Sequence, residues 1–461
     1  MTNPEQAIQY IHTNFERFIR ELSEYATIPS VSFPGYPPEP LNESAQWTAR
    51  KMKDAGLEHV EILEIPGAPP FVVGDWLHAP GAPTVLLYAH HDVQPPGRPE
   101  KWLSPAFAPQ RRGDRLYGRG VVDDKAGALM HLFALEAYLK TSGKLPVNVR
   151  FLIEGEEETG SEHLGEFVRR YKDRLKADVM VLTDTANLDL GLPSLTYRLR
   201  GLVDAIVEVR TLDHPVHSGM WGGPTLDALS ALNRILARLT TEDGKIAIPD
   251  FYEGIEPVVG LEKERLRALP FEEKKFLNEV GAVESLQLAG ERDFSVYERI
   301  WCRPACAILG IDAPQVAKTS NQIVESARAK VSIRIVSGMD PEKSRQRLCD
   351  FLKKDPPYGA QVTVKPGTAG RPWKVDPVGP AYEAAARALK RGFGRDAVFI
   401  GCGGSIPFVE PLTHEFGGIP ALLIGLEDPF CNAHGENESL YLPDWKKGME
   451  SAVWLFSERI V

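Results

Sequence analysis

Residues 83–92 read PTVLLYAHHD, an apolar run that ends abruptly in two histidines and an aspartate. A run without polar alternation is typical of a strand that is buried on both faces of its sheet. Two more such runs follow at 146–155 and 177–184, and helical patterns separate the three runs at 126–140 and 163–175. This alternation predicts an α/β fold with a mostly parallel sheet that helices cover on both faces.

The pattern changes near residue 201. We expect strands at 202–210, 330–338 and 360–367, with helices at 224–239, 261–280 and 340–354. From about residue 371 to the end of the chain, predicted strands and helices alternate again, as they do before residue 201. Residues 1–200 and 371–461 are therefore predicted to form one discontinuous domain, into which residues 201–370 insert as a smaller α+β domain.

Composition narrows the choice of partners and compartment. The 461 residues carry 53 basic and 63 acidic side chains, a net charge of −10, without basic blocks. We expect no nucleic-acid partner and no membrane partner, because nucleic acids and anionic membranes are negatively charged and attract cationic proteins. Five scattered cysteines do not resemble a secreted disulfide framework, and the first residues do not resemble a signal peptide. The protein is expected to be cytoplasmic.

Histidines and carboxylates follow several of the predicted strands. They are His90, His91 and Asp92; Asp123 and Asp124; Glu156, Glu157 and Glu158; Asp184; and His434. The carboxyl ends of parallel strands meet at one edge of a sheet, so we expect these side chains to lie together. Carboxylates so placed repel one another unless a cation neutralises them, and mixed histidine and carboxylate ligands suit Zn²⁺ or Mn²⁺.

Each motif alone has an ordinary structural interpretation. The acidic run at 156–158 could be a solvated face, and the Asp123–Asp124 pair could cap the helix that follows it. Only their joint occurrence at strand ends favours a metal site. Because side chains alternate along a strand, His90 and Asp92 share a face and His91 points away. His90 is then the better ligand, and Asp92 is placed to orient its imidazole.

A series of motifs then resembles a known family, the M20 metallopeptidases, and in particular their dipeptidase branch of carnosine-type and cytosolic non-specific dipeptidases. In order, the motifs are YAHHDVQP, WLSPAFAPQRRGDRLYGRGVVDDKAG, IEGEEETGS, LTDT, TYRLRGL, HSGMWGG, VSIRIV, GGSIP and CNAHGENE. The VQP after Asp92 is more similar to the dipeptidase branch than to the deacetylase and desuccinylase branches.

The resemblance implies two divalent metal ions per chain, Zn²⁺ or Mn²⁺, with Co²⁺ also possible. Asp123 would bridge them, with His90 and Asp184 completing one site and Glu158 and His434 the other. It also implies that the Asp123–Asp124 peptide bond is cis. The inserted domain would serve as a lid and dimerisation domain, and the protein would be a homodimer.

Roles for other residues follow from the same resemblance. Glu157 would be the general base, and Asp92 would orient His90. His217 would polarise the scissile carbonyl, in its own site or in that of the partner subunit. Residues expected to bind the substrate are Arg334 and Ser405, for the C-terminal carboxylate, and Asn321. The chain departs from the family pattern at Ala89, usually glycine, and at His91, usually apolar, and His91 leaves the choice of the ligand imidazole open.

The sequence thus predicts a dinuclear metallohydrolase that cleaves the amide bond of dipeptides or short peptides with a free C-terminal carboxylate. A metal-bridging hydroxide would attack the carbonyl while Glu157 handles the proton. The alternative within the same site is an N-acyl amino acid amidohydrolase. A non-catalytic two-domain binding module is a more distant alternative, because it gives no reason for a carboxylate base beside a ligand carboxylate.

Overall fold

The structure is a computed structural model that describes residues 2–404, 406 and 409–460. The chain divides into two compact units. The first unit comprises Met1–Tyr197, Asp376–Ile400 and Ile406–Val461, and the second comprises Arg198–Val375 and Gly401–Ser405. The chain therefore leaves the first unit, builds nearly all of the second and then returns.

The first unit is built on a sheet with the strand order β1-β2-β6-β3-β7-β17-β8. These strands are β1 (Glu58–Leu63), β2 (Phe71–Trp76), β3 (Thr84–His90), β6 (Asn148–Glu154), β7 (Val179–Ala186), β8 (Ser194–Leu199) and β17 (Ala421–Glu427). The central strands β6, β3, β7 and β17 run parallel, whereas β2 and β8 flank them in the antiparallel direction. This mostly parallel sheet confirms the predicted fold class.

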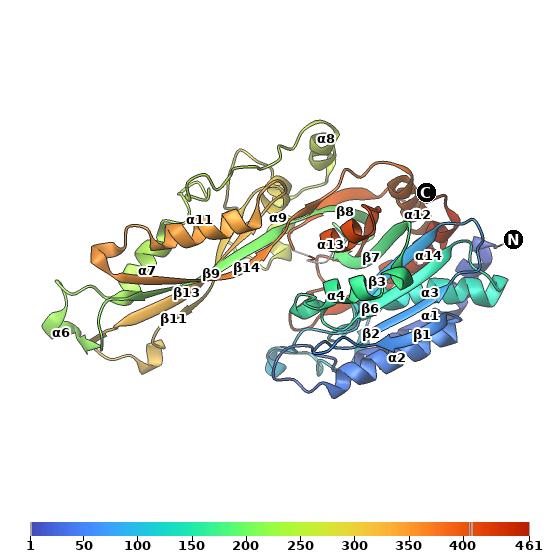
Figure 1. The fold of residues 1–461 in the computed structure, drawn as a ribbon, viewed down its shortest axis with the longest axis horizontal. Helices are drawn as coiled ribbons and strands as arrows, with labels where there is room; N and C mark the ends of the chain where they lie inside the picture. The colour runs from blue at the N-terminus through green and yellow to red at the C-terminus, as the bar shows by residue number, and fades with distance from the viewer. Residues whose placement is uncertain (1, 405, 407–408, 461) are drawn as a thin grey trace. The chain divides into compact units, whose positions relative to one another are not determined.

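Helices lie on both sides of this sheet (Figure 1). They are α1 (Pro4–Ala26), α2 (Glu39–Ala55), α3 (Lys125–Ser142), α4 (Leu164–Arg170), α5 (Lys172–Leu175), α12 (Pro380–Phe393), α13 (Val409–Glu415) and α14 (Leu442–Ser457). Helix α3 packs between β3 and β7 on one side and α1 and α14 on the other, so nearly all its side chains are buried. Burial on both faces also explains the uninterrupted apolar run of β3.

Several short strands add to the sheets of the protein. β4 (Gln110–Arg112), β5 (Arg115–Tyr117) and β18 (Ser439–Tyr441) form a small sheet of their own, whereas β15 (Trp373–Lys374) and β16 (Val398–Cys402) pair with β8. Among the residues that the structure describes, no helix has both the length and the apolar character needed to cross a membrane.

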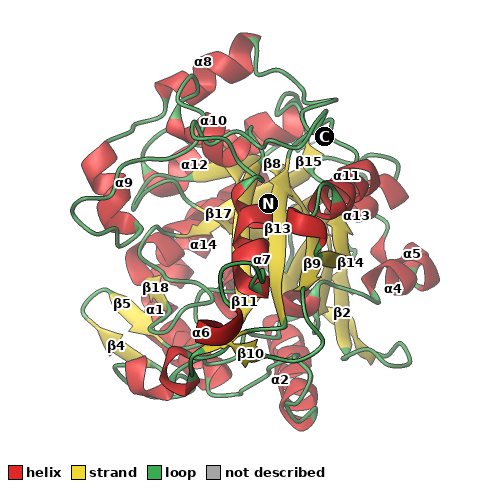
Figure 2. Cartoon of the chain, turned by 90° about the vertical axis from the view of Figure 1, so that its left-hand side faces the viewer, coloured by secondary structure: helices red, strands yellow, loops and turns green. Residues whose placement is uncertain are grey.

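The second unit contains an antiparallel sheet with the order β11-β13-β9-β14. Its strands are β9 (Gly201–Arg210), β11 (Ala305–Asp312), β13 (Ser326–Ile335) and β14 (Gln361–Gly370). Helices α7 (Ala228–Ala237) and α11 (Pro341–Lys353) pack against the sheet, as Figures 1 and 2 show. The core side chains of β9 alternate, from Val203 through Ala205 and Val207 to Val209, because only one face of this sheet is covered.

Smaller elements of the second unit are β10 (Val216–His217), α6 (Ser218–Trp221), α8 (Gly260–Ala268), α9 (Glu273–Glu279), α10 (Val296–Trp301) and β12 (Gln322–Ile323). The single helix expected at 261–280 is wrong. The structure has two helices there, α8 and α9, because Pro270 between them has no N–H to continue a helix. The helix expected at 163–175 is likewise interrupted, at Tyr171, and forms α4 and α5.

Candidate active site

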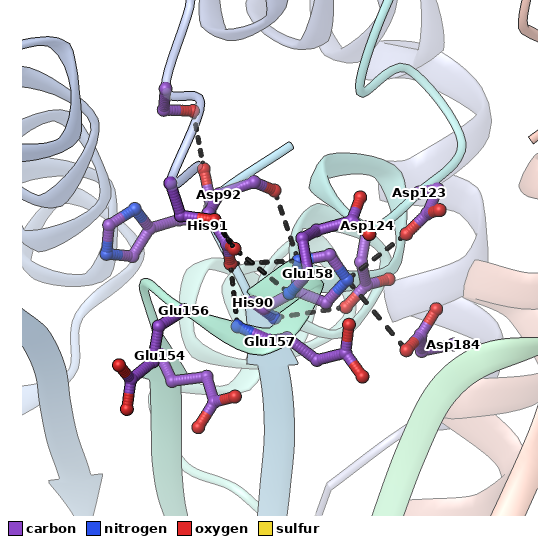
Figure 3. A network of polar contacts seen from close by, with 12 residues as sticks. His90, His91, Asp92, Asp123, Asp124, Glu154, Glu156, Glu157, Glu158 and Asp184 are labelled. Atoms are coloured by element: carbon purple, nitrogen blue, oxygen red, sulfur yellow. Dashed lines mark hydrogen bonds and ion pairs between the residues drawn. The ribbon is translucent and has the colours of Figure 1, made fainter. Parts of the chain in front are cut away.

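The candidate site lies at the carboxyl edge of the parallel strands of the first unit. His90 ends β3, Glu157 and Glu158 begin the 3-10 turn η2 (Glu157–Thr159) after β6, and Asp184 lies near the end of β7. Figure 3 shows these side chains turned toward a common space, together with Asp123. Parallel strands place their carboxyl ends at one edge, so residues far apart in sequence meet there.

His90 is held in one orientation by Asp92. The Nδ1 atom of His90 lies 3.1 Å from the backbone carbonyl oxygen of Asp92 and 3.3 Å from its Oδ1 atom. A carbonyl only accepts hydrogen bonds, so Nδ1 carries a proton and the lone pair of a neutral ring is left on Nε2. That atom faces Asp123 and Asp184, at 3.1 Å and 3.8 Å, in the arrangement that metal-binding histidines adopt.

Asp92 also positions the two glutamates. Its carboxylate accepts hydrogen bonds from the backbone N–H groups of Glu157, at 3.2 Å, and Glu158, at 3.1 Å. The hydroxyl of Ser32 donates a further bond of 2.7 Å to the same carboxylate. One buried aspartate thus fixes both the imidazole and the turn that carries the proposed base.

Asp123 lies between two imidazoles. Its Oδ1 atom is 3.1 Å from Nε2 of His90, and its Oδ2 atom is 2.9 Å from Nε2 of His434. The same Nε2 atom of His434 is 3.3 Å from Oε2 of Glu158. A carboxylate that offers one oxygen to each side is suited to bridge two cations. The Asp123–Asp124 peptide bond is cis, as expected.

The donor atoms fit divalent cations. One nitrogen or oxygen from each of His90, Glu157 and Asp184 lies within 4.8 Å of the other two, and the same holds for Asp123, Glu158 and His434. Nitrogen and carboxylate oxygen without thiolate suit Zn²⁺, Mn²⁺ and related ions. The first group includes Glu157, whereas the family resemblance implies that Asp123 completes the ligand set of His90 and Asp184.

The pKa values of the carboxylates in the cluster also indicate that positive charge would stabilise it. Burial, followed by the charge of Asp123, raises the pKa of Asp184 to about 6. Burial and the neighbouring carboxylates likewise raise the pKa values of Glu157 and Glu158 well above their usual range. Divalent cations at this edge would remove the repulsion that disfavours the ionised forms.

We therefore expect metal ions to stabilise the protein more at higher pH. Without metal, the folded chain holds protons on Asp184, Glu157 and Glu158 more tightly than the unfolded chain does. Its free energy of unfolding should thus lose this contribution as the pH rises through about 6, whereas in the metal-loaded protein the bound cations keep these carboxylates ionised over this pH range.

Calorimetric melting of chelator-treated and metal-loaded protein between about pH 5 and pH 8 tests this expectation. The gap in melting temperature should widen with pH. Buried histidines outside the proposed ligand set, such as His131, contribute equally to both samples and cancel in the difference. A gap that stays constant or narrows would contradict a site assembled from carboxylates with raised pKa values.

Two neighbours of the site, His91 and Glu156, face away from it. Nε2 of His91 donates to the backbone oxygen of Pro70 at 2.9 Å, and the ring lies away from Asp123 in Figure 3. His90 is therefore the imidazole that faces the site, as strand alternation predicts. Glu156 pairs with His163 at 2.9 Å, so only two of the three consecutive glutamates face the cluster.

A buried ion pair, for which the sequence gives no signal, links the segment that carries Asp123 to the loop that carries His434. Arg119 and Glu438 lie 2.7 Å apart, and both are almost completely buried. The carboxylate of Glu438 accepts hydrogen bonds from the backbone N–H groups of Gly120, Val122 and Asp123. The guanidinium of Arg119 donates to the backbone oxygen of His434 at 3.1 Å.

Glu438→Gln should therefore destabilise the protein by about 3–5 kcal/mol, the usual cost of leaving one charge of a buried pair uncompensated. Urea unfolding of the metal-loaded protein measures this change. Glu436→Gln is the matched control, because Glu436 pairs with the exposed Arg98 and such surface pairs contribute about 0–1 kcal/mol. Equal stabilities of the two variants would show that the buried pair does not hold these loops.

In the second unit, the structure brings two predicted residues together. His217 pairs with Gln322 in the β10–β12 ribbon, and the backbone N–H of Ser218 donates to the oxygen of Asn321 at 2.8 Å. The backbone N–H groups of Gly219 and Met220 donate to Nδ1 of His217, at 3.1 and 3.3 Å. The ring proton of a neutral His217 therefore lies on Nε2, and this exposed side chain is ready to donate.

Arg334 lies half-buried on β13 in the second unit, near a second arginine, Arg200, that was not predicted as a site residue. Burial, and then the charge of Arg334, lowers the pKa of Arg200 to about 10. Two guanidinium groups close enough to repel favour an anion beside them. The motif TYRLRGL contains Arg200, but the sequence alone does not show that it meets Arg334. Ser405 lies outside the described residues.

A cavity of about 1180 Å³ opens beside the cluster within the first unit. Glu158 and Ser32 reach it from the site, and Phe33, Tyr36 and Pro69 contribute to its apolar walls. Glu158 is thus the member of the cluster that lines this cavity.

Comparisons with known proteins give a consistent result. The model of peptidase family M20/M25/M40 matches residues 86–456. The cysteinylglycine-S-conjugate dipeptidase of Corynebacterium striatum is 31% identical over 434 residues, which cover 93% of this chain and 92% of that protein. The solved structure of the dipeptidase Dug1p from Saccharomyces cerevisiae has a TM-score of 0.86 at 25% identity and covers 99% of this chain and 98% of its own. The solved structure of human carnosine dipeptidase 1 has a TM-score of 0.85 at 27% identity, and the match covers 99% of this chain and 100% of that chain.

Proposed function

The chain belongs to peptidase family M20/M25/M40 and is a metallopeptidase, and from this premise we propose that it hydrolyses dipeptides or short peptides with a free C-terminal carboxylate. The observation that carries the proposal is the position of Asp123, which offers one oxygen to His90 and the other to His434, with the half-buried Glu157 close to His90. The dipeptidase activity in the names of the relatives, which align along nearly the whole chain, supports the substrate class.

In this proposal each chain holds two divalent ions, Zn²⁺, Mn²⁺ or Co²⁺. His90, Asp123 and Asp184 would hold one ion, and Asp123, Glu158 and His434 the other. When bound, such ions lower the pKa of water and attract negative charge that develops on a substrate oxygen.

Glu157 is the proposed general base. It takes a proton from the attacking water and delivers this proton to the leaving amine. Its burial and its raised pKa suit a group that must both accept and release a proton near neutral pH. Asp92 acts by positioning, since it holds the backbone of Glu157 and the ring of His90 at once.

The second unit is proposed to bind and polarise the substrate. The Nε2–H of His217 would donate to the scissile carbonyl oxygen as negative charge develops there. Arg334, with Arg200, would bind the C-terminal carboxylate, and Asn321 and Ser405 remain proposed substrate contacts. We place His217 in the site of a partner subunit, so the protein would act as a homodimer in which this unit serves as lid and dimerisation domain.

Hydrolysis of a free dipeptide beside its N-acetylated form by metal-reconstituted protein tests the substrate class. Cleavage of the free dipeptide alone supports the proposal. Preference for the acetylated compound would favour the N-acyl amino acid amidohydrolase, which uses the same cluster. Cleavage of neither by protein with two bound metals would show that the substrate class is wrong.

A further inference from the structure

Glu427 brings another carboxylate to the metal cluster, and neither the motif series nor the proposed mechanism uses it. It is the last residue of β17, which runs parallel to β7, and it lies opposite Ala186 there. Asp184 lies two residues before Ala186. The two side chains therefore leave neighbouring parallel strands at the same edge of the sheet.

The position of Glu427 matches that of a ligand. One carboxylate oxygen from each of Asp123, Asp184 and Glu427 lies within 4.8 Å of the other two. Oxygen atoms about 2.0–2.2 Å from one shared cation are separated by at most about 4.4 Å, so this spacing needs little adjustment to close around an ion.

The carboxylate of Glu427 also lacks a compensating partner. Within the described part of the chain, its side chain makes no hydrogen bond and no ion pair. Its backbone, in contrast, is fixed, because its carbonyl oxygen accepts a bond of 2.7 Å from the N–H of Asn187. This carboxylate is half-buried among other carboxylates, and a nearby cation would stabilise its ionised form.

We infer that Glu427 is a further ligand of the ion that Asp123 and Asp184 hold with His90. This inference rests on the proposed metal centre. It makes the two ion sites unequal, because one has three carboxylates and one imidazole, whereas the other has Asp123, Glu158 and His434. Oxygen-rich sites suit Mn²⁺ more than Zn²⁺, so Glu427 should favour Mn²⁺ at its site.

Mn²⁺ titration of the metal-free protein tests the inference, with calorimetry for affinity and electron paramagnetic resonance for the number and coupling of bound ions. In Glu427→Gln, one of the two Mn²⁺ affinities should fall at least about tenfold, while the other should change little. Zn²⁺ affinity at the same site should fall less. Glu427→Asp, which keeps a shorter carboxylate, should bind Mn²⁺ with an affinity between those of the wild type and Glu427→Gln.

Glu436→Gln provides the control, since it removes a carboxylate of the loop after β17 that pairs with Arg98. It should bind two Mn²⁺ ions as the wild type does. Circular dichroism of each metal-free variant verifies folding, and Glu427→Asp supplies the measurement if Glu427→Gln does not fold.

Unchanged Mn²⁺ affinities in both Glu427 variants would overturn the inference. If KM for a free dipeptide rose at the same time and KM for the N-acetylated form did not, Glu427 would instead bind the substrate's ammonium group. These results are distinct from a failure of the proposed function, in which the wild-type protein itself would bind fewer than two ions or cleave no dipeptide.

Discussion

Glu157→Gln is expected to lower kcat by about 10²–10⁴ while two metal ions stay bound, because general acid–base catalysis contributes that much and the amide keeps the shape of the side chain. The amide of glutamine cannot take a proton from water. Its backbone N–H still donates to Asp92, so the turn that carries Glu158 should stay in place. Steady-state hydrolysis of a free dipeptide, with metal content measured on the same samples, gives the result.

Glu156→Gln is the matched control, because this adjacent carboxylate pairs with His163 and faces away from the cluster. It should keep nearly full activity. If Glu157→Gln instead lost a metal ion together with its activity, Glu157 would be a ligand, as its proximity to His90 and Asp184 allows. Nearly full activity in Glu157→Gln would exclude it as the base.

His217→Ala is expected to lower kcat by about 10²–10³, the usual effect of removing one hydrogen-bond donor from developing oxyanion charge. Metal content should not change, since His217 belongs to a different unit from every proposed ligand. His214→Ala is the control, because His214 is an exposed histidine of the same segment and its ring contacts Asp213. An equal loss in both variants would indicate a structural effect on the segment.

Mixing the two inactive chains decides in which subunit His217 acts. In a heterodimer of Glu157→Gln and His217→Ala chains, an intersubunit His217 gives one site both wild-type groups. Activity should then reappear on subunit exchange. If His217 acts within its own chain, each site of the heterodimer keeps one defect and the mixture stays inactive.

The cluster of histidines and carboxylates could be predicted from the sequence, because its residues lie beside strands with strong apolar signals. β3, β6 and β7 are buried on both faces, so their ends, and the polar residues at those ends, can be located in the sequence. Alternation along β3 also separated His90 from His91 correctly. Whether these residues bind metal and carry out the roles proposed for them stays a prediction.

Other features of the structure have no comparable signal in the sequence. β1 and β11 are mostly exposed edge strands, which show no apolar periodicity, and neither was predicted. The Arg119–Glu438 pair joins residues 319 positions apart, and only the folded chain shows that they meet. Glu427 directly follows the apolar run of β17, but in the sequence it is indistinguishable from an ordinary polar residue at a strand end.

The return of the chain to its first unit sets an order for biosynthesis. β17 lies between β7 and β8 in the sheet, and Arg119 donates to the backbone of His434 from 315 residues away. A nascent chain that has emerged from the ribosome only as far as the second unit lacks both the strand that separates β7 from β8 and one of the two imidazoles of the cluster. If this cluster holds the metal ions, as we propose, a complete centre can capture them only after the whole chain has been synthesised, and we expect no hydrolase activity from an unfinished chain.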